Sequence, residues 1–203
     1  TRAIGLACNK IIRLIVRGLA LSRIHPNVLT FLGLVINIIA AYLLAIGQFR
    51  GAGYVIIGAG LFDMVDGRVA RETNRVTRFG GFFDSVLDRY SDLALLMGLL
   101  VWYGSINRPF YVVMTALAMT ACVMVSYTRA RAENSIPTCK VGFMERPERV
   151  VLVIIGALFS RMAPVIWVIA VLGNLTVVHR MIFTWQEAKR LEEAQLKIGR
   201  AHV

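Results

Sequence analysis

The stretch from residue 63 to residue 88 reads DMVDGRVARETNRVTRFGGFFDSVLD, and it places four aspartates in and beside long apolar segments. They are Asp63, Asp66, Asp84 and Asp88. An ionisable side chain within a membrane-spanning helix is energetically costly, so it marks a functional site by default. Four carboxylates this close together are hard to place in a bilayer unless cations neutralise their charge.

Six apolar segments surround and include this stretch, and they predict an all-α integral membrane protein with six transmembrane helices. The segments cover about residues 28–47, 51–70, 82–103, 109–128, 149–160 and 163–185. Most of them approach the roughly 20 residues that a helix needs to cross a bilayer. The fifth is short, so it either recruits residues 144–149 as a polar first turn or inserts only partly. The alternative is a soluble bundle of six buried helices.

The distribution of basic residues argues for the membrane. The chain of 203 residues has a net charge of +11. With six spans, 20 of its 23 Lys and Arg residues lie on the side of both termini, and only Arg50, Arg108 and Arg161 lie opposite. Basic loops concentrate on the cytoplasmic side of a membrane. We therefore expect a multi-pass protein of the cell membrane, with both termini and the aspartates at the cytoplasmic face and with anionic lipid, not nucleic acid, as its partner.

The sequence divides into three regions. Residues 1–23 predict an amphipathic juxtamembrane helix, because Lys10, Arg13 and Arg17 recur at helical spacing beside Ile and Leu residues. An ordinary packed helix is the alternative there. Residues 24–190 form the expected six-helix membrane domain, and residues 191–203 form a polar C-terminal tail.

Small and acidic residues recur at helical spacing within two consecutive segments. They are Asp63, Asp66, Gly67 and Ala70 in the first segment and Gly80, Asp84 and Asp88 in the second. Each set shares one helix face. Because consecutive spans are antiparallel, the two faces can converge on a hard cation such as Mg²⁺, Mn²⁺ or Ca²⁺. Salt bridges to nearby arginines are the alternative, but they do not explain the small residues on the aspartate face.

The pattern DxxDGxxAR, eight further residues and GxxxDxxxD resembles the signature of the CDP-alcohol phosphotransferases at every fixed position. The matching residues are Asp63, Asp66, Gly67, Ala70, Arg71, Gly80, Asp84 and Asp88. The resemblance implies an enzyme that transfers the phosphatidyl group of a CDP-linked lipid, CDP-diacylglycerol, to an alcohol and releases CMP. It also implies a homodimer formed through the spanning helices.

The same resemblance implies roles for individual residues. Asp63, Asp66, Asp84 and Asp88 would hold two Mg²⁺ or Mn²⁺ ions, and Asp88 would also be the general base. Five residues would frame the cytidine and its diphosphate: Gly67, Ala70, Arg71, Thr77 and Gly80.

A second informative pair of stretches reads SYTRARAE over residues 126–133 and GFMERPER over residues 142–149. Their arginines suit a phosphorylated acceptor, because Arg pairs with phosphate through two parallel hydrogen bonds. Loop arginines paired with Glu133, Glu145 and Glu148 are the alternative. The stretches resemble prokaryotic phosphatidylinositol-phosphate synthases, whose acceptor is inositol 1-phosphate, and relatives that use an archaeal CDP-lipid. By this resemblance the acceptor-binding residues are Asn27, Arg129, Arg131, Arg146, Arg149 and Arg180.

Two further interpretations remain open. Glycerol 3-phosphate also needs a cationic pocket, whereas serine or free inositol fits the arginines less well. An ion transporter with acidic metal sites is the more distant alternative. Its charged residues should lie near the middle of the bilayer between structural repeats, but here the aspartates gather at one end and no repeat is visible.

Overall fold

The computed structural model describes residues 26–72 and 77–201, and all regular structure in these ranges is helical. The helices are α2 (Pro26–Ala45), α3 (Phe49–Glu72), α4 (Arg78–Ser105), α5 (Pro109–Ala132), α6 (Arg146–Leu158) and α7 (Met162–Ala201). The predicted surface helix over residues 1–23 lies outside the described residues. The predicted all-α class is confirmed.

Each of the six predicted apolar segments corresponds to one helix; the fifth is short, as predicted, and the last is longer than predicted. Helix α6 has 13 residues and begins only at Arg146, so it is shorter than the roughly 20 residues of a full span. Helix α7 has 40 residues and continues to Ala201, through most of the predicted polar tail. Three helical stretches in the described part are long and apolar enough to cross a membrane: Asn27–Ala45, Pro109–Ala132 and Met162–Ala194.

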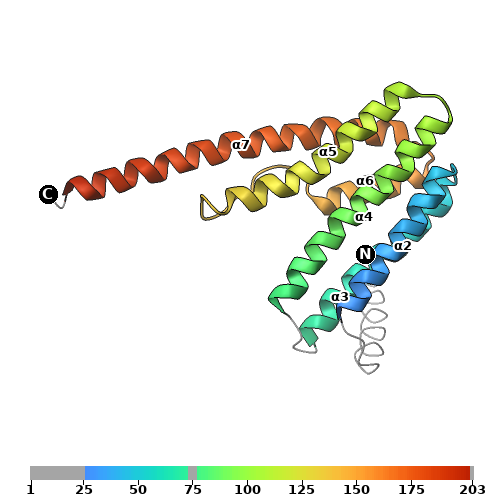
Figure 1. The fold of residues 1–203 in the computed structure, drawn as a ribbon, viewed down its shortest axis with the longest axis horizontal. Helices are drawn as coiled ribbons and strands as arrows, with labels where there is room; N and C mark the ends of the chain where they lie inside the picture. Colours follow the sequence, from blue (N-terminus) through green and yellow to red (C-terminus); the bar gives the residue numbers. More distant parts are fainter. Residues whose placement is uncertain (1–25, 73–76, 202–203) are drawn as a thin grey trace, which may run out of the picture.

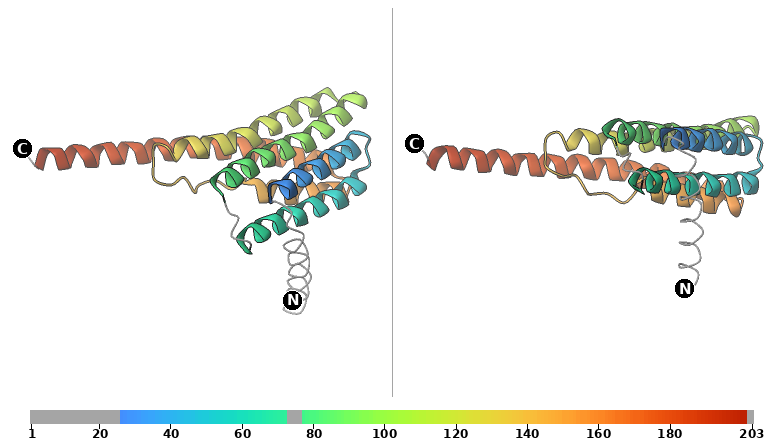
Figure 2. Two further views of the ribbon diagram at one scale, coloured as in Figure 1. Left: turned by 60° about the horizontal axis from the view of Figure 1, so that its bottom comes forward. Right: turned by 90° about the horizontal axis from the view of Figure 1, so that it is seen from below.

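The helices form an elongated bundle in which α7 runs well beyond the other elements (Figures 1 and 2). Helix α2 packs on α3 and α4, α5 packs on α4 and α7, and α6 packs on α3 and α7. The bundle core contains the fully buried side chains of Leu44, Ile56, Leu99 and Ile166. Many large apolar side chains face outward instead, as expected of helices that contact lipid.

Helices α2 and α4 approach each other closely at Gly98. A Cβ atom on Gly98 would lie 2.2 Å from the carbonyl oxygen of Ala41, which is far inside a normal contact. Glycine therefore allows the two backbones to meet there, as small residues do at helix contacts in membranes.

The start of α4 is fixed by Thr77. This residue has extended backbone angles, and its Oγ1 accepts a hydrogen bond of 2.9 Å from the amide of Gly80. Such a cap satisfies one of the N–H groups that have no partner within the first turn of a helix. It sets the register of α4, and with it the direction in which Asp84 and Asp88 project.

Candidate active site

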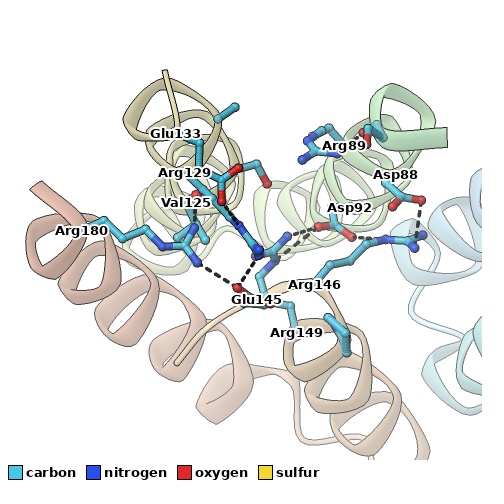
Figure 3. A pocket seen from close by; sticks show the side chains of 14 residues that line it. Asp88, Arg89, Asp92, Val125, Arg129, Glu133, Glu145, Arg146, Arg149 and Arg180 are labelled. Carbon is cyan, nitrogen blue, oxygen red and sulfur yellow. Dashed lines mark hydrogen bonds and ion pairs between the residues drawn. The ribbon is translucent and has the colours of Figure 1, made fainter. Parts of the chain in front are cut away.

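A cavity of about 420 Å³ lies where α4, α5, α6 and α7 meet (Figure 3). Its size lies within the range of small-molecule sites. Five arginines line it, Arg89, Arg129, Arg146, Arg149 and Arg180, together with four carboxylates, Asp88, Asp92, Glu133 and Glu145. The cavity is therefore polar and carries charge of both signs.

Four of the six residues predicted to bind the acceptor line this cavity: Arg129, Arg146, Arg149 and Arg180. Arg131 does not, because it follows Arg129 by two positions on α5 and so points to another face of the helix. It is exposed and lines a separate apolar pocket beside Trp185. Asn27 is also elsewhere: its Oδ1 lies 3.4 Å from the point where a Cβ on Gly80 would be. Asn27 thus accompanies a residue predicted for the donor.

Arg180 and Arg149 are almost fully buried, with 1% and 4% of their surfaces exposed. Arg180 donates from Nε to the carbonyl of Val141 at 2.8 Å and from Nη1 to the carbonyl of Val125. Its Nη2 lies 3.0 Å from Oε1 of Glu145. A guanidinium has five N–H groups, and these contacts engage three of them. Arg180 also lines the cavity.

Arg149 is held chiefly by Asp92. Its Nε and Nη2 donate to Oδ2 of Asp92 at 3.2 and 2.6 Å, and its Nη1 donates to the carbonyl of Met144 at 3.0 Å. A buried charge of this kind needs an opposite charge and hydrogen bonds to be tolerated. The Asp92 carboxylate provides both.

Arg146 connects the arginines to the predicted metal ligands. Its Nη2 lies 2.8 Å from Oδ2 of Asp63, and its Nη1 lies 2.9 Å from Oδ1 of Asp88. Its Nε lies 3.8 Å from Oδ1 of Asp92 and is buried without a hydrogen-bond partner among the described residues. Carboxylates from α3 and α4 thus converge on the single positive charge of Arg146.

The donor atoms of the aspartates show whether these residues suit a metal ion. The donors are carboxylate oxygens only, which are the ligands that Mg²⁺ and Mn²⁺ prefer. The oxygens of Asp63 and Asp88 already share one cationic group. Asp84 lies one turn before Asp88 on the same face of α4. Among residues whose side chains are described, no three acidic, His or Cys side chains form a complete metal site, and the side chain of Asp66 lies outside that set.

The remaining predicted donor-site residues lie at the same end of the bundle. Asp66, Gly67, Ala70 and Arg71 belong to the last turns of α3, where the structure describes the helix but not the side chains. Thr77 and Gly80 lie at the start of α4, where they are joined by the capping hydrogen bond. The structure therefore gathers the two halves of the motif around the junction of α3 and α4.

Four charged residues that line the cavity were not predicted as functional: Arg89, Asp92, Glu133 and Glu145. Asp92 is only 7% exposed and continues the spacing of four that Asp84 and Asp88 begin, so the sequence did contain a signal for it. Glu145 was considered only as an ion-pair partner of loop arginines. The structure shows it in that position, with Arg129 and Arg180.

Comparison with known proteins agrees with this geometry. The family model described as CDP-alcohol phosphatidyltransferase matches residues 23–186. The archaetidylinositol phosphate synthase of Pyrococcus horikoshii is 35% identical over 177 residues, which are 87% of this chain and 90% of that protein. The phosphatidylinositol phosphate synthase of Mycobacterium tuberculosis is 36% identical over 183 residues, 84% of each chain.

Solved structures of the mycobacterial synthase are also similar. The structure with CDP-DAG bound superposes with a TM-score of 0.81 at 34% identity, covering 87% of this chain and 94% of that one. The structure in complex with manganese and citrate gives a TM-score of 0.79 at 35% identity, covering 86% and 88%. With the complete aspartate motif, a matching fold and these relatives, the chain belongs to the CDP-alcohol phosphatidyltransferase family and is a membrane-bound CDP-alcohol phosphotransferase.

Proposed function

We propose that this enzyme transfers the phosphatidyl-type group of a CDP-linked lipid to inositol 1-phosphate and releases CMP. The observation that carries the proposal is the arginine-lined cavity that opens beside Asp88. It offers a phosphate site next to the expected general base. Relatives named as inositol phosphate synthases, with either phosphatidyl or archaetidyl products, support the same acceptor.

The reaction has one bond-making and one bond-breaking event at phosphorus. The acceptor hydroxyl attacks the phosphorus nearest the lipid, and the bond from that phosphorus to the bridging oxygen breaks, so that CMP leaves with the electron pair. Asp88 accepts the hydroxyl proton. Such general-base assistance is typically worth roughly 10²–10⁴-fold in rate. In this structure Arg146 contacts Oδ1 of Asp88, so Oδ2 is the oxygen proposed to take the proton.

Asp63, Asp66, Asp84 and Asp88 would hold the metal, which we propose to be two Mg²⁺ or Mn²⁺ ions. When bound, divalent ions neutralise diphosphate charge and stabilise the leaving group. The oxygen-only donors described above fit this role, and the manganese complex of the mycobacterial relative supports it. Gly67, Ala70, Arg71, Thr77 and Gly80 then remain the proposed contacts of the cytidine diphosphate.

The acceptor phosphate would bind Arg149 and Arg180 first, with Arg129 and Arg146 at the sides of the cavity. The two buried guanidiniums are held in place by backbone carbonyls as well as by carboxylates. Their orientation is therefore fixed before the acceptor arrives. Such preorganisation reduces the entropic cost of binding.

The proposed topology places the cavity below the cytoplasmic surface of the membrane. Helix α6 has 13 residues, which correspond to a length of about 20 Å, against a hydrocarbon core of about 30 Å. Because α6 is too short to cross the whole core, its first turn, where Arg146 lines the cavity, would lie below the membrane surface. We propose that six helices occupy the membrane over residues 24–190, with both termini cytoplasmic, and that the enzyme is a homodimer.

The test is CMP release by the purified protein in detergent with Mg²⁺ and CDP-diacylglycerol. Inositol 1-phosphate, glycerol 3-phosphate, inositol and serine would be supplied in parallel, and each reaction would be repeated with CDP-archaeol. We expect release with inositol 1-phosphate alone. Release with another acceptor would retain the chemistry but refute the acceptor, and no release with any combination would refute the proposed reaction.

A further inference from the structure

The carboxylate of Glu145 lies between two arginines that come from different helices (Figure 3). Its Oε1 is 2.8 Å from Nη1 of Arg129 on α5 and 3.0 Å from Nη2 of Arg180 on α7. A single anionic oxygen thus bridges two guanidiniums. A phosphate oxygen makes the same kind of contact when it binds an arginine pair.

The local backbone makes this placement of Glu145 unusual. Glu145 is the N-cap residue of α6, with φ −79° and ψ 178°, yet its side chain makes no capping hydrogen bond. Acidic side chains are favourable at the N-terminus of a helix, where they interact with the free N–H groups and the helix dipole. The Glu145 side chain instead reaches across the cavity to the arginines.

The contact is asymmetric, because only one side of it is fixed. Arg180 is 1% exposed, and besides Glu145 it is bound to the carbonyls of Val141 and Val125. The Glu145 side chain is 43% exposed. Glu145 can therefore withdraw toward solvent while the guanidinium of Arg180 keeps its position.

We propose that Glu145 is a specificity-determining residue that occupies the position of the acceptor phosphate and has to be displaced by it. This inference rests on the proposed function. The cavity is lined by five arginines and four carboxylates, so withdrawal of Glu145 raises the excess of positive charge there, which suits a phosphate anion. An uncharged alcohol cannot replace Glu145 between the arginines. Selectivity would thus come from a built-in competitor as well as from attraction.

The test is binding of inorganic phosphate to the full chain in detergent, measured by isothermal titration calorimetry without metal or CDP-lipid. Glu145→Gln removes the competing charge and keeps an amide oxygen that can accept the hydrogen bonds. We expect phosphate to bind about tenfold more tightly to Glu145→Gln, equivalent to about 1.4 kcal/mol. Glu145→Asp, which withdraws the carboxylate by one methylene, should bind phosphate more tightly than the unmodified chain but less tightly than Glu145→Gln.

Glu133→Gln is the matched control. Among the described residues, the Glu133 carboxylate pairs with Arg129 alone, at 3.2 Å, and both side chains are at least about one third exposed. Exposed pairs contribute little, so phosphate affinity should change less than about twofold. Equal or weaker phosphate binding by Glu145→Gln would overturn the inference, because Glu145 would then organise the arginines instead of competing for them. Absence of phosphate binding by all variants would overturn it as well.

The outcome can be separated from that of the proposed function. Suppose that Glu145→Gln binds phosphate more tightly but the unmodified chain releases no CMP with inositol 1-phosphate. This result would retain the role of Glu145 and refute inositol 1-phosphate as the acceptor. Normal CMP release with unchanged phosphate affinity would retain the reaction and refute only the role of Glu145.

Discussion

The buried ion pair between Asp92 and Arg149 provides a strong test of how the cavity is held together. Both side chains are less than 10% exposed, and Oδ2 of Asp92 accepts two hydrogen bonds, of 3.2 and 2.6 Å, from Arg149. Asp92→Asn would leave Arg149 buried without its counter-charge. Removing one partner of a buried pair costs about 3–5 kcal/mol. For a domain of this size, each kcal/mol shifts the unfolding midpoint by roughly 2–4 °C, so we expect a decrease of roughly 6–20 °C.

The assay is thermal unfolding of purified protein in one detergent at one scan rate, followed by circular dichroism. Glu193→Gln is the control, since it breaks the pair of Lys189 and Glu193, whose atoms are 4.0 Å apart and whose side chains are at least 60% exposed. That change should cost at most about 0.5 kcal/mol. A surface effect of that size corresponds to a shift of at most about 2 °C. An unfolding midpoint of Asp92→Asn within about 2 °C of the control would therefore refute the reasoning.

Three further changes test other parts of the structure. Asp88→Asn should lower CMP release at least about 100-fold while CDP-lipid binding persists, and normal turnover would exclude Asp88 as the base. Arg149→Glu should raise the KM for inositol 1-phosphate much more than the KM for CDP-lipid, whereas equal increases would contradict a role in acceptor binding. Gly98→Ala should lower the unfolding midpoint, because its Cβ would lie 2.2 Å from the Ala41 carbonyl oxygen, whereas Gly104→Ala, which has open space around it, should not.

The helices could be predicted from apolar segments, but the end of the last one could not. Hydropathy marks residues suited to lipid, and it therefore placed the end of the last segment at about residue 185. Helix α7 continues to Ala201 because Ala, Glu, Lys, Leu and Gln, which dominate residues 186–201, are strong helix formers in water as well. The start of α6 at Arg146 agrees with the polar first turn predicted within residues 144–149, with Glu145 extended at the N-cap and Pro147 in the first turn.

The site could be predicted only as far as helix faces. Spacing grouped Asp84 with Asp88 on one face of α4 and Asp63 with Asp66 on one face of α3, although the structure does not describe the Asp66 side chain. The same spacing could have added Asp92. Spacing could not reveal that Arg146 contacts Asp63, 83 positions away, because that contact depends on how α6 packs against α3. Arg131 was grouped with Arg129 by the family resemblance, although residues two positions apart on a helix do not share a face.

Charge pairing explains how this site is tolerated among apolar helices. Arg146 is paired with Asp63 and Asp88, Arg149 with Asp92, and Arg180 with Glu145. Unpaired charges at such positions would each cost several kcal/mol. In the proposed reaction the same arginines would bind the phosphorylated acceptor, and the same aspartates would bind the metal ions. The ion pairs would then keep each charged group compensated until substrate and metal replace the internal partners, so the buried charge would serve both stability and binding.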